Sequence, residues 1–519
     1  MVQLVSLPSR RRRWLAVTVL LSCAAACLIF TTSAQNPPAT GLDSIRGEEL
    51  REKLSYIASE KFKGRGNGTP ELKMAAEYIA EIFKKNGIRP AAGGGYYQFF
   101  DMYTSRLGPD NDVRVVSNGT ELKLTIRTDF IPEFWSASSH ITGSMILVDR
   151  GSSTPDLKGK IAVVVEGQGL ADDPEFPENA VIGRNVENAG ALGLIVVPDP
   201  MDRRQERITA LAENFRDDLP TRLMPMATAD SPDYPSIPVI LVSSDAGRQL
   251  LADLKSPQTS AQAAMTTDVL RKTFRTQNVC GVVEGEDPAI RNEVMIIGAH
   301  YDHDGEAYGQ IWYGADDDGS GTAALLEIAE AFGNGAKLAR SVLLCAWAGE
   351  EKGLLGSRYY ASHPIFQLSR TVAMLQMDMI GRNEEHAADG PEGIPEERAS
   401  ENNNTLNVLG SAFSPDLKAI ISRLNSETGL TIRFRYDVGA QDLLRRSDQW
   451  SFLSKGIPSV FFFTGLHPDY HTPRDTAAKI NYPKLEKIAK LVYLSAFEIA
   501  NNASRPKFLK PATAAQKAY

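Results

Sequence analysis

The stretch that decides the fold reads VMIIGAHYD at residues 294–302. Its first part, Val294–Gly298, is a continuous apolar run, which is typical of a parallel strand covered on both faces. Similar runs recur at Val342–Ala346, Val372–Leu375 and Val460–Phe463, and amphipathic segments separate them. This alternation predicts an α/β fold with a mixed, mostly parallel sheet and helices on both faces.

Helices are predicted around these strands from apolar residues at helical spacing. They lie at residues 43–60, 70–86, 320–333, 354–361, 414–428 and 483–501. Gly87 ends the second helix, and Pro483 opens the last one at a first-turn position. Each apolar stripe needs a partner, and the sheet supplies it.

The pattern of apolar and turn residues changes between residues 113 and 275. Short β-rich runs such as Lys160–Val165 and Pro238–Val242 alternate there with Gly, Pro and Asp turns, and one amphipathic helix is expected near 179–190. This pattern predicts a separate β-rich domain inserted into the α/β domain. The predicted organisation is a signal peptide at 1–34, an N-terminal helical part of the α/β domain at 35–112, the inserted domain at 113–275, the rest of the α/β domain at 276–505 and a flexible tail at 506–519.

The first 34 residues have the layout of a secretory signal. Arg10–Arg13 precede the apolar run Trp14–Phe30, and Thr32–Ala34 offers small residues for cleavage. We therefore expect an exported protein, periplasmic or extracellular, with no stable membrane span after cleavage. The alternative is an anchor, formed by the uncleaved signal or by a lipid, because Leu20–Cys23 loosely resembles a lipoprotein cleavage box.

Charge and cysteine content exclude some functions. The formal charge is −8, and it becomes −12 without the first 34 residues, which hold four arginines and no acidic residue. This balance argues against nucleic-acid binding. Cys280 and Cys345 lie in apolar strand-like runs, which favours buried thiols over a disulfide, and sequence alone cannot pair them.

Acidic and imidazole side chains follow the predicted strands. The candidates are His300, the run Asp316–Asp318, Glu350, Glu351, Asp378 and His471. Singly, each has an ordinary explanation as a turn or a solvated residue. Together they converge, because open α/β sheets bind ligands at the carboxyl ends of their strands. Carboxylates and imidazoles suit zinc, and two metals about 3.5–4 Å apart can share one nucleophilic water. The pattern predicts a hydrolase.

At these residues the chain closely resembles a known family. The motifs, in order, are AHYD at 299–302, GADDDGSG at 314–321, EE at 350–351, MDMIG at 377–381 and YHTP at 470–473. They resemble those of the di-zinc aminopeptidases typified by bacterial leucyl aminopeptidases, a family that also includes glutamate carboxypeptidases and has the zinc-peptidase fold. The inserted segment resembles a protease-associated (PA) domain in LKGK at 157–160 and NAGALG at 188–193. One departure is Ser447-Asp448-Gln449, where many bacterial relatives have Ser-Asp-His.

The resemblance implies a ligand set and two Zn²⁺ per chain. Asp316 is expected to bridge the ions, with His300 and Asp378 completing one coordination sphere and Glu351 and His471 the other. The resemblance also suggests a cis peptide bond between Asp316 and Asp317. His303, His363, His386 and His467 are competing imidazoles.

The remaining residues of the pattern have predicted catalytic roles. Glu350 has no metal in this scheme and is expected to take a proton from the bridging water and deliver it to the leaving amine. Asp302 is expected to accept the other N–H of His300 and so fix its tautomer. Tyr470 is expected to donate to the developing oxyanion.

The predicted function is hydrolysis of N-terminal residues from peptides by an exported di-zinc metallopeptidase. One alternative is a carboxypeptidase acting on acidic C-terminal residues, in which Arg382, Arg445 or Arg446 holds the substrate carboxylate. Another is a receptor-like protein that binds through its PA domain, although the complete ligand set and Glu350 weigh against it. Peptides are the predicted partners, and the sequence makes no prediction of the oligomeric state.

Overall fold

The computed structural model describes residues 39–148, 156–167, 178–199, 207–213, 215–216, 219, 224–229, 234–255, 260–386, 397–437 and 443–510. The predicted signal peptide lies outside the described residues, as does most of the predicted tail. No helix within these ranges combines the length and the apolar character that crossing a membrane requires.

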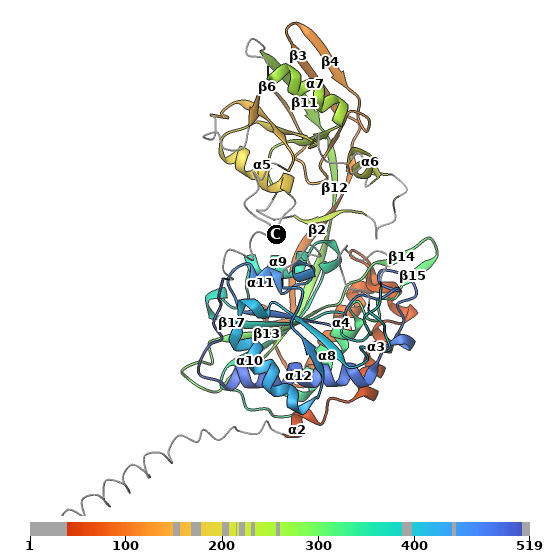
Figure 1. Ribbon diagram of the computed structural model, residues 1–519, viewed down its shortest axis with the longest axis vertical. Helices are drawn as coiled ribbons and strands as arrows, with labels where there is room; N and C mark the ends of the chain where they lie inside the picture. The colour runs from red at the N-terminus through yellow and green to blue at the C-terminus, as the bar shows by residue number, and fades with distance from the viewer. Residues whose placement is uncertain are drawn as a thin grey trace, which may run out of the picture. The chain divides into compact units, whose positions relative to one another are not determined.

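A ten-stranded sheet forms the centre of the α/β fold (Figure 1). Its order is β19-β18-β20-β17-β13-β16-β12-β2-β9, with β1 beside β12. The strands are β1 (Arg89–Pro90), β2 (Tyr97–Leu107), β9 (Met226–Thr228), β12 (Val269–Val283), β13 (Val294–His300), β16 (Ser341–Trp347), β17 (Thr371–Met377), β18 (Thr405–Leu409), β19 (Thr431–Arg433) and β20 (Ser459–Phe463). The four predicted apolar runs are neighbours in one parallel block, β16-β13-β17-β20, and antiparallel pairs adjoin it on both sides.

Helices cover both faces of this sheet, as predicted. They are α2 (Ala39–Leu42), α3 (Gly47–Ile57), α4 (Pro70–Lys85), α8 (Gly319–Gly333), α9 (Leu355–Ser362), α10 (Pro415–Leu424), α11 (Trp450–Leu453) and α12 (Tyr482–Asn501). Ile297 and Leu344 pack in one cluster with residues of α3, α4, α8 and α12. The alternate residues, Ile296 and Leu343, pack on the other face with Tyr360 of α9. Successive side chains of a strand point to opposite faces, so a continuous apolar run fills both layers. The predicted fold class is confirmed.

A second, eight-stranded sheet lies within the predicted β-rich segment, in the order β4-β3-β11-β6-β7-β8-β10-β5. The strands of this sheet are β3 (Asp112–Ser117), β4 (Thr120–Leu124), β5 (Phe130–Pro132), β6 (Ser139–Val148), β7 (Lys160–Val165), β8 (Gly193–Val197), β10 (Val239–Val242) and β11 (Ala261–Thr267). The helices of the same segment are α5 (Glu178–Asn188), α6 (Arg207–Glu213) and α7 (Ser244–Leu254). Val163 and Val164 belong to apolar clusters on opposite faces of this sheet. Strand β12 of the first sheet extends through the predicted boundary between residues 275 and 276.

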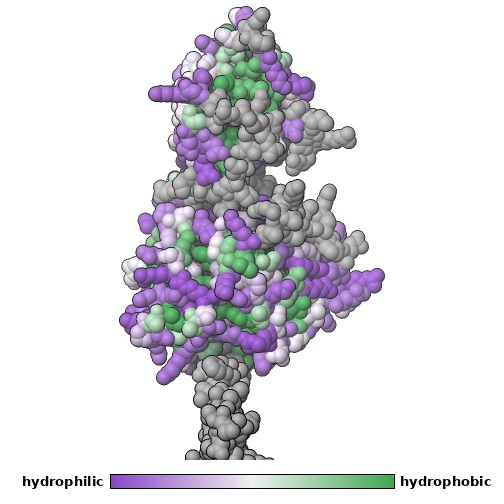
Figure 2. Space-filling view, turned by 60° about the vertical axis from the view of Figure 1, so that its left-hand side comes forward, coloured by the Kyte–Doolittle hydropathy of each residue, from purple (hydrophilic) through white to green (hydrophobic). Residues whose placement is uncertain are grey.

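Short elements complete the described chain. They are the hairpin β14 (Gly305–Ala307) and β15 (Gln310–Trp312) and the 3₁₀ turns η1 (Glu60–Arg65), η3 (Glu350–Lys352), η4 (Leu368–Arg370), η5 (Ser411–Phe413), η6 (Asn425–Glu427), η7 (Leu443–Arg445) and η8 (Ala477–Lys479). On the face shown in Figure 2 the coloured surface is largely hydrophilic, with small apolar patches between the polar side chains.

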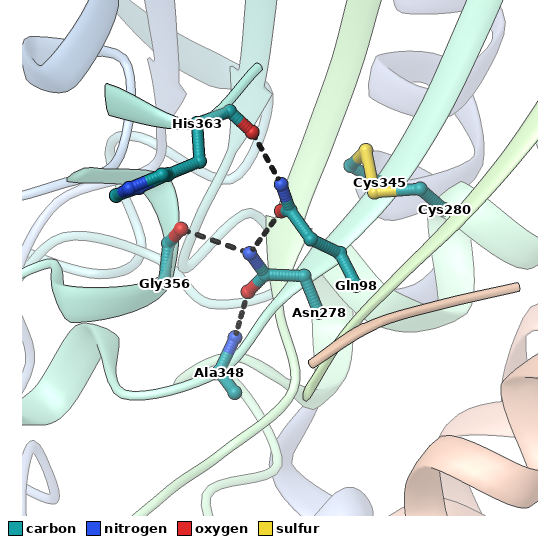
Figure 3. Close-up of a disulfide and its surroundings, with 7 residues drawn as sticks. All are labelled: Gln98, Asn278, Cys280, Cys345, Ala348, Gly356 and His363. Carbon is teal, nitrogen blue, oxygen red and sulfur yellow. Dashed lines mark hydrogen bonds between the residues drawn. A yellow bond between two sulfur atoms is a disulfide. The ribbon is translucent and has the colours of Figure 1, made fainter. Parts of the chain in front are cut away.

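The two cysteines form a disulfide, which corrects the expectation of free thiols (Figure 3). Cys280 on β12 and Cys345 on β16 are paired directly across two antiparallel strands, with their Cα atoms 4.3 Å apart. Both side chains are fully buried. They are 65 positions apart in the sequence, so only the register of the sheet brings them together.

A polar network beside the disulfide joins β12 to the loop that follows β16 (Figure 3). The side chain of Asn278 accepts a hydrogen bond from the backbone N–H of Ala348 and donates to the carbonyl of Gly356 and to Gln98. Ala348 lies two residues before Glu350. The network therefore helps to fix the backbone that carries the two glutamates.

Candidate metal centre

The predicted ligands lie at the carboxyl ends of neighbouring parallel strands. His300 is the last residue of β13, and Asp378 follows β17 directly. Glu350 and Glu351 open η3, after β16, and His471 lies in the loop after β20. Parallel strands end at one edge of the sheet, so residues far apart in sequence meet there.

Three successive aspartates precede α8, and each has different contacts. Asp316 accepts a hydrogen bond from the backbone N–H of Gly381 at 2.6 Å. Asp318 caps α8 by accepting from Gly321 N–H, and it also accepts from the backbone N–H of His300. The carboxylate of Asp317 lies between two imidazoles.

The structure corrects the prediction for Asp316. Its side chain lies within hydrogen-bonding distance of Gly381 and is 3.3 Å from His467 Nε2, away from the other predicted ligands. The aspartate that joins them is its neighbour, Asp317. The cis prediction is also wrong by one residue, because the cis peptide bond links Asp317 and Asp318. Of the three aspartates, the second lies among the other candidate ligands.

One group of ligand atoms surrounds His300 Nε2. Asp317 Oδ1 lies 3.2 Å from this nitrogen, Asp378 Oδ1 lies 3.5 Å from it, and Glu350 Oε2 lies 3.7 Å from it. His300 is fully buried, and its Nε2 makes no hydrogen bond of acceptable geometry among the described residues.

A second group surrounds His471 Nε2. Asp317 Oδ2 and Glu351 Oε2 each lie 3.1 Å from this nitrogen. The two oxygens of Asp317 therefore face different imidazoles, one in each group. A single carboxylate in this position can serve two ions.

The geometry of both groups fits zinc. Atoms that bind one tetrahedral zinc at about 2.0–2.2 Å lie roughly 3.3–3.6 Å from one another. The nitrogen-to-oxygen separations here run from 3.1 to 3.7 Å. The buried imidazole nitrogen makes no hydrogen bond and is surrounded by carboxylates. Together these nitrogen and oxygen atoms form the kind of donor set that zinc prefers.

The tautomer of His300 is fixed by Asp302, but not through the predicted atom. His300 Nδ1 lies 3.1 Å from the backbone oxygen of Asp302 and 3.8 Å from its carboxylate Oδ1. A carbonyl only accepts, so Nδ1 carries the proton and Nε2 is left with its lone pair. The Asp302 carboxylate instead accepts from the backbone N–H of Glu350 and from the amide of Asn67.

His303 contacts a predicted ligand instead of competing with it. Its Nδ1 lies 2.5 Å from Glu351 Oε1, and its ring packs edge-on against His471. Glu351 thus has one oxygen toward His471 and the other held by His303. Neither His303 nor Asn67 was assigned this positioning role from the sequence. The fourth residue of the HYDH run is the signal that could have identified His303.

Other histidines lie away from the two groups. His467 is fully buried beside Asp316, whereas His363 and His386 are exposed.

The adjacent glutamates differ in their electrostatics. Burial raises the pKa of Glu350 well above its ordinary value, and the charges of Asp378 and Glu351 act in the same direction against the opposing effect of His300. Burial also favours the neutral form of Glu351, but His471 and His303 outweigh it and hold the pKa of that carboxyl well below its usual range. Carboxyl groups whose environments separate their pKa values in this way are suited to different roles.

A pocket opens beside the ligands. It is lined by Asp317, Glu350, Asp378, Met379, Leu443, Arg446, Phe461, Phe463, Leu466, Tyr470 and His471. Tyr470, the predicted oxyanion donor, stacks on His471 with ring centroids 3.9 Å apart. Of the three arginines considered for a substrate carboxylate, Arg446 lines this pocket, whereas Arg382 donates to Asp469 and Arg445 lies over the Trp450 ring.

Two family models match parts of this chain. Residues 278–496 match the model of peptidase family M28, and residues 127–250 match the model of the PA domain. Residues 278–496 are therefore similar to peptidase family M28. The predicted resemblance to this family and the predicted PA domain are confirmed.

Several named proteins are similar to this chain. "Aminopeptidase YwaD" of Bacillus subtilis is 25% identical over 69% of this chain and 66% of its own length. "Probable glutamate carboxypeptidase VP8" of Zea mays is 29% identical over 47% of this chain and 35% of its own length. The chain thus spans less than two thirds of the length of either relative. Among solved structures, "Aminopeptidase from Aneurinibacillus sp. strain AM-1" has a TM-score of 0.49 at 21% identity, covering 91% of this chain and 97% of that one.

Proposed function

We propose that this protein is a di-zinc aminopeptidase that hydrolyses N-terminal residues from peptides. The observation that carries the proposal is the carboxylate of Asp317, whose two oxygens lie 3.2 Å from His300 Nε2 and 3.1 Å from His471 Nε2. In the proposed ligand set Asp317 would hold both zinc ions. His300 and Asp378 complete one site, and Glu351 and His471 complete the other.

Bound zinc ions would supply Lewis-acid polarisation of the scissile carbonyl and lower the pKa of the attacking water. Glu350 lines the same pocket and is left outside the ligand set. Its carboxylate accepts the proton of the attacking water and returns it to the leaving amine. Tyr470 donates its hydroxyl hydrogen bond to the carbonyl oxygen as negative charge develops there.

The amino end is favoured by the charge of the pocket and by one named relative. Glu350, which is outside the proposed ligand set, presents a carboxylate to the pocket, where a free α-ammonium would find a partner. An acylated amine would leave this charge without a partner. The Bacillus subtilis relative is named an aminopeptidase.

The choice between chain ends is tested with blocked peptides. We expect hydrolysis of a leucine-initiated peptide to be abolished by N-acetylation and unaffected by C-terminal amidation, with products identified by mass spectrometry. The opposite pattern would instead identify a carboxypeptidase, the alternative for which Arg446 could bind the terminal carboxylate. If neither peptide is cleaved, the receptor-like alternative is favoured.

We also propose export with cleavage of the first 34 residues. The support is the signal-like sequence and the disulfide between Cys280 and Cys345, because structural disulfides persist in oxidising compartments. Protein recovered from its native cells should begin near Gln35, and a thiol-blocking reagent should add mass only after reduction. An intact amino terminus with two thiols that react without reduction would refute export and the disulfide together.

A further inference from the structure

The pocket beside the catalytic groups is lined by both polar and apolar side chains. Glu350 and Asp378 are among its polar lining residues. Met379, Phe461 and Phe463 are among its apolar lining residues, and they belong to a buried apolar cluster. A substrate side chain that enters this pocket meets apolar surface along its length.

Arg446 adds a cation to the same pocket. Its side chain is exposed, and it has no ion pair or side-chain hydrogen bond within the described part of the chain. The neighbouring Arg445 differs, because its guanidinium lies 5.2 Å from the centre of the Trp450 ring. Arg446 and Tyr470 line the same pocket. Arg446 therefore lies on the substrate side of the site.

The backbone that carries Arg446 is held in one conformation. Its N–H donates to the carbonyl of Leu443 at 3.2 Å. The side chain of Gln449, the residue that departs from the pattern of many bacterial relatives, donates to the carbonyl of Leu444. Both bonds close the turn on which Arg446 lies.

Two of the three carboxylates that line this pocket already have imidazole partners. Asp317 lies between His300 and His471, and Asp378 is in contact with His300. A guanidinium presents several donors in one plane, which match the two oxygens of a carboxylate. We therefore expect a bound substrate to supply the carboxylate that pairs with Arg446.

We propose that Arg446 gives the pocket a preference for a substrate residue whose side chain ends in a carboxylate, with glutamate as the best fit. The inference rests on the proposed aminopeptidase function and names its substrate class. The methylene groups of a glutamate side chain would contact the apolar lining residues, and its carboxylate would pair with Arg446. A lysine side chain would be disfavoured by the like charge.

The test compares substrates that differ by one charge. Glutamyl and glutaminyl p-nitroanilides have nearly the same shape, and neither has a C-terminal carboxylate. The wild-type enzyme should hydrolyse the glutamyl compound with a kcat/KM about tenfold or more above that of the glutaminyl compound. Arg446→Met should bring this ratio close to one, and Arg446→Glu should shift the preference toward a lysyl anilide. Arg445→Met is the matched control and should keep the wild-type ratio.

The outcomes separate the two proposals. Hydrolysis of leucyl anilide by the wild-type enzyme supports aminopeptidase action whatever the glutamyl-to-glutaminyl ratio. A ratio near one in the wild type, or one that Arg446→Met leaves unchanged, overturns the role of Arg446 alone. Loss of activity on Leu-Gly but not on Leu-Gly amide in Arg446→Met would show that Arg446 binds a chain end, which also overturns it. No hydrolysis of any anilide would reject both proposals.

Discussion

Replacing Glu350 by Gln is expected to lower kcat by roughly 10²–10⁴-fold and to leave the bound zinc unchanged. The amide has nearly the shape of the carboxyl group but cannot accept a proton from water. Glu350 Oε2 is also the most distant of the carboxylate oxygens around His300 Nε2, at 3.7 Å. The change therefore removes proton transfer and preserves the proposed ligands.

Metal analysis and steady-state kinetics on the same preparation check this expectation. Glu351→Gln, at the next position, is the matched control and should lose zinc, because Glu351 lies 3.1 Å from His471 Nε2 within the proposed second site. Full activity of Glu350→Gln would rule out its role as the base. Loss of zinc from this variant would instead make Glu350 a ligand.

Asp317→Asn is expected to weaken binding of both zinc ions by about 100-fold or more and to reduce activity in parallel. This residue alone contacts both imidazoles in the proposed ligand set, so one substitution affects both sites. An amide has no charge to offset two dications. Zinc retention in competition with a chelator measures the effect without reference to turnover.

Asp316→Asn is the comparison that decides between neighbouring aspartates. The asparagine oxygen can still accept the N–H of Gly381, so this variant should retain both ions. Thermal unfolding of the two variants shows whether either change acts through loss of structure. Zinc loss from Asp316→Asn with zinc retained by Asp317→Asn would restore Asp316 as the bridging ligand.

The strands and helices could be predicted because each leaves a local periodic signal. Continuous apolar runs predicted the parallel block, and helical spacing predicted α8 and α12 to within a residue or so. The same pattern predicted the edge of the sheet at which the candidate ligands lie, because residues that follow parallel strands meet at one end of the sheet. That rule alone is enough to place His300, Glu351, Asp378 and His471 at one edge.

The sequence alone could not predict contacts that depend on strand register and backbone direction. Residues 316–318 are chemically identical, and only their backbone path decides that Asp316 meets Gly381, Asp317 meets the two imidazoles and Asp318 caps α8. The pairing of Cys280 with Cys345 likewise depends on the alignment of β12 with β16. Sequence alone determined which elements form and at which edge the chemistry lies, because apolar periodicity is local. Tertiary structure decided which atom faces which, because such contacts are set by packing between segments far apart in the chain.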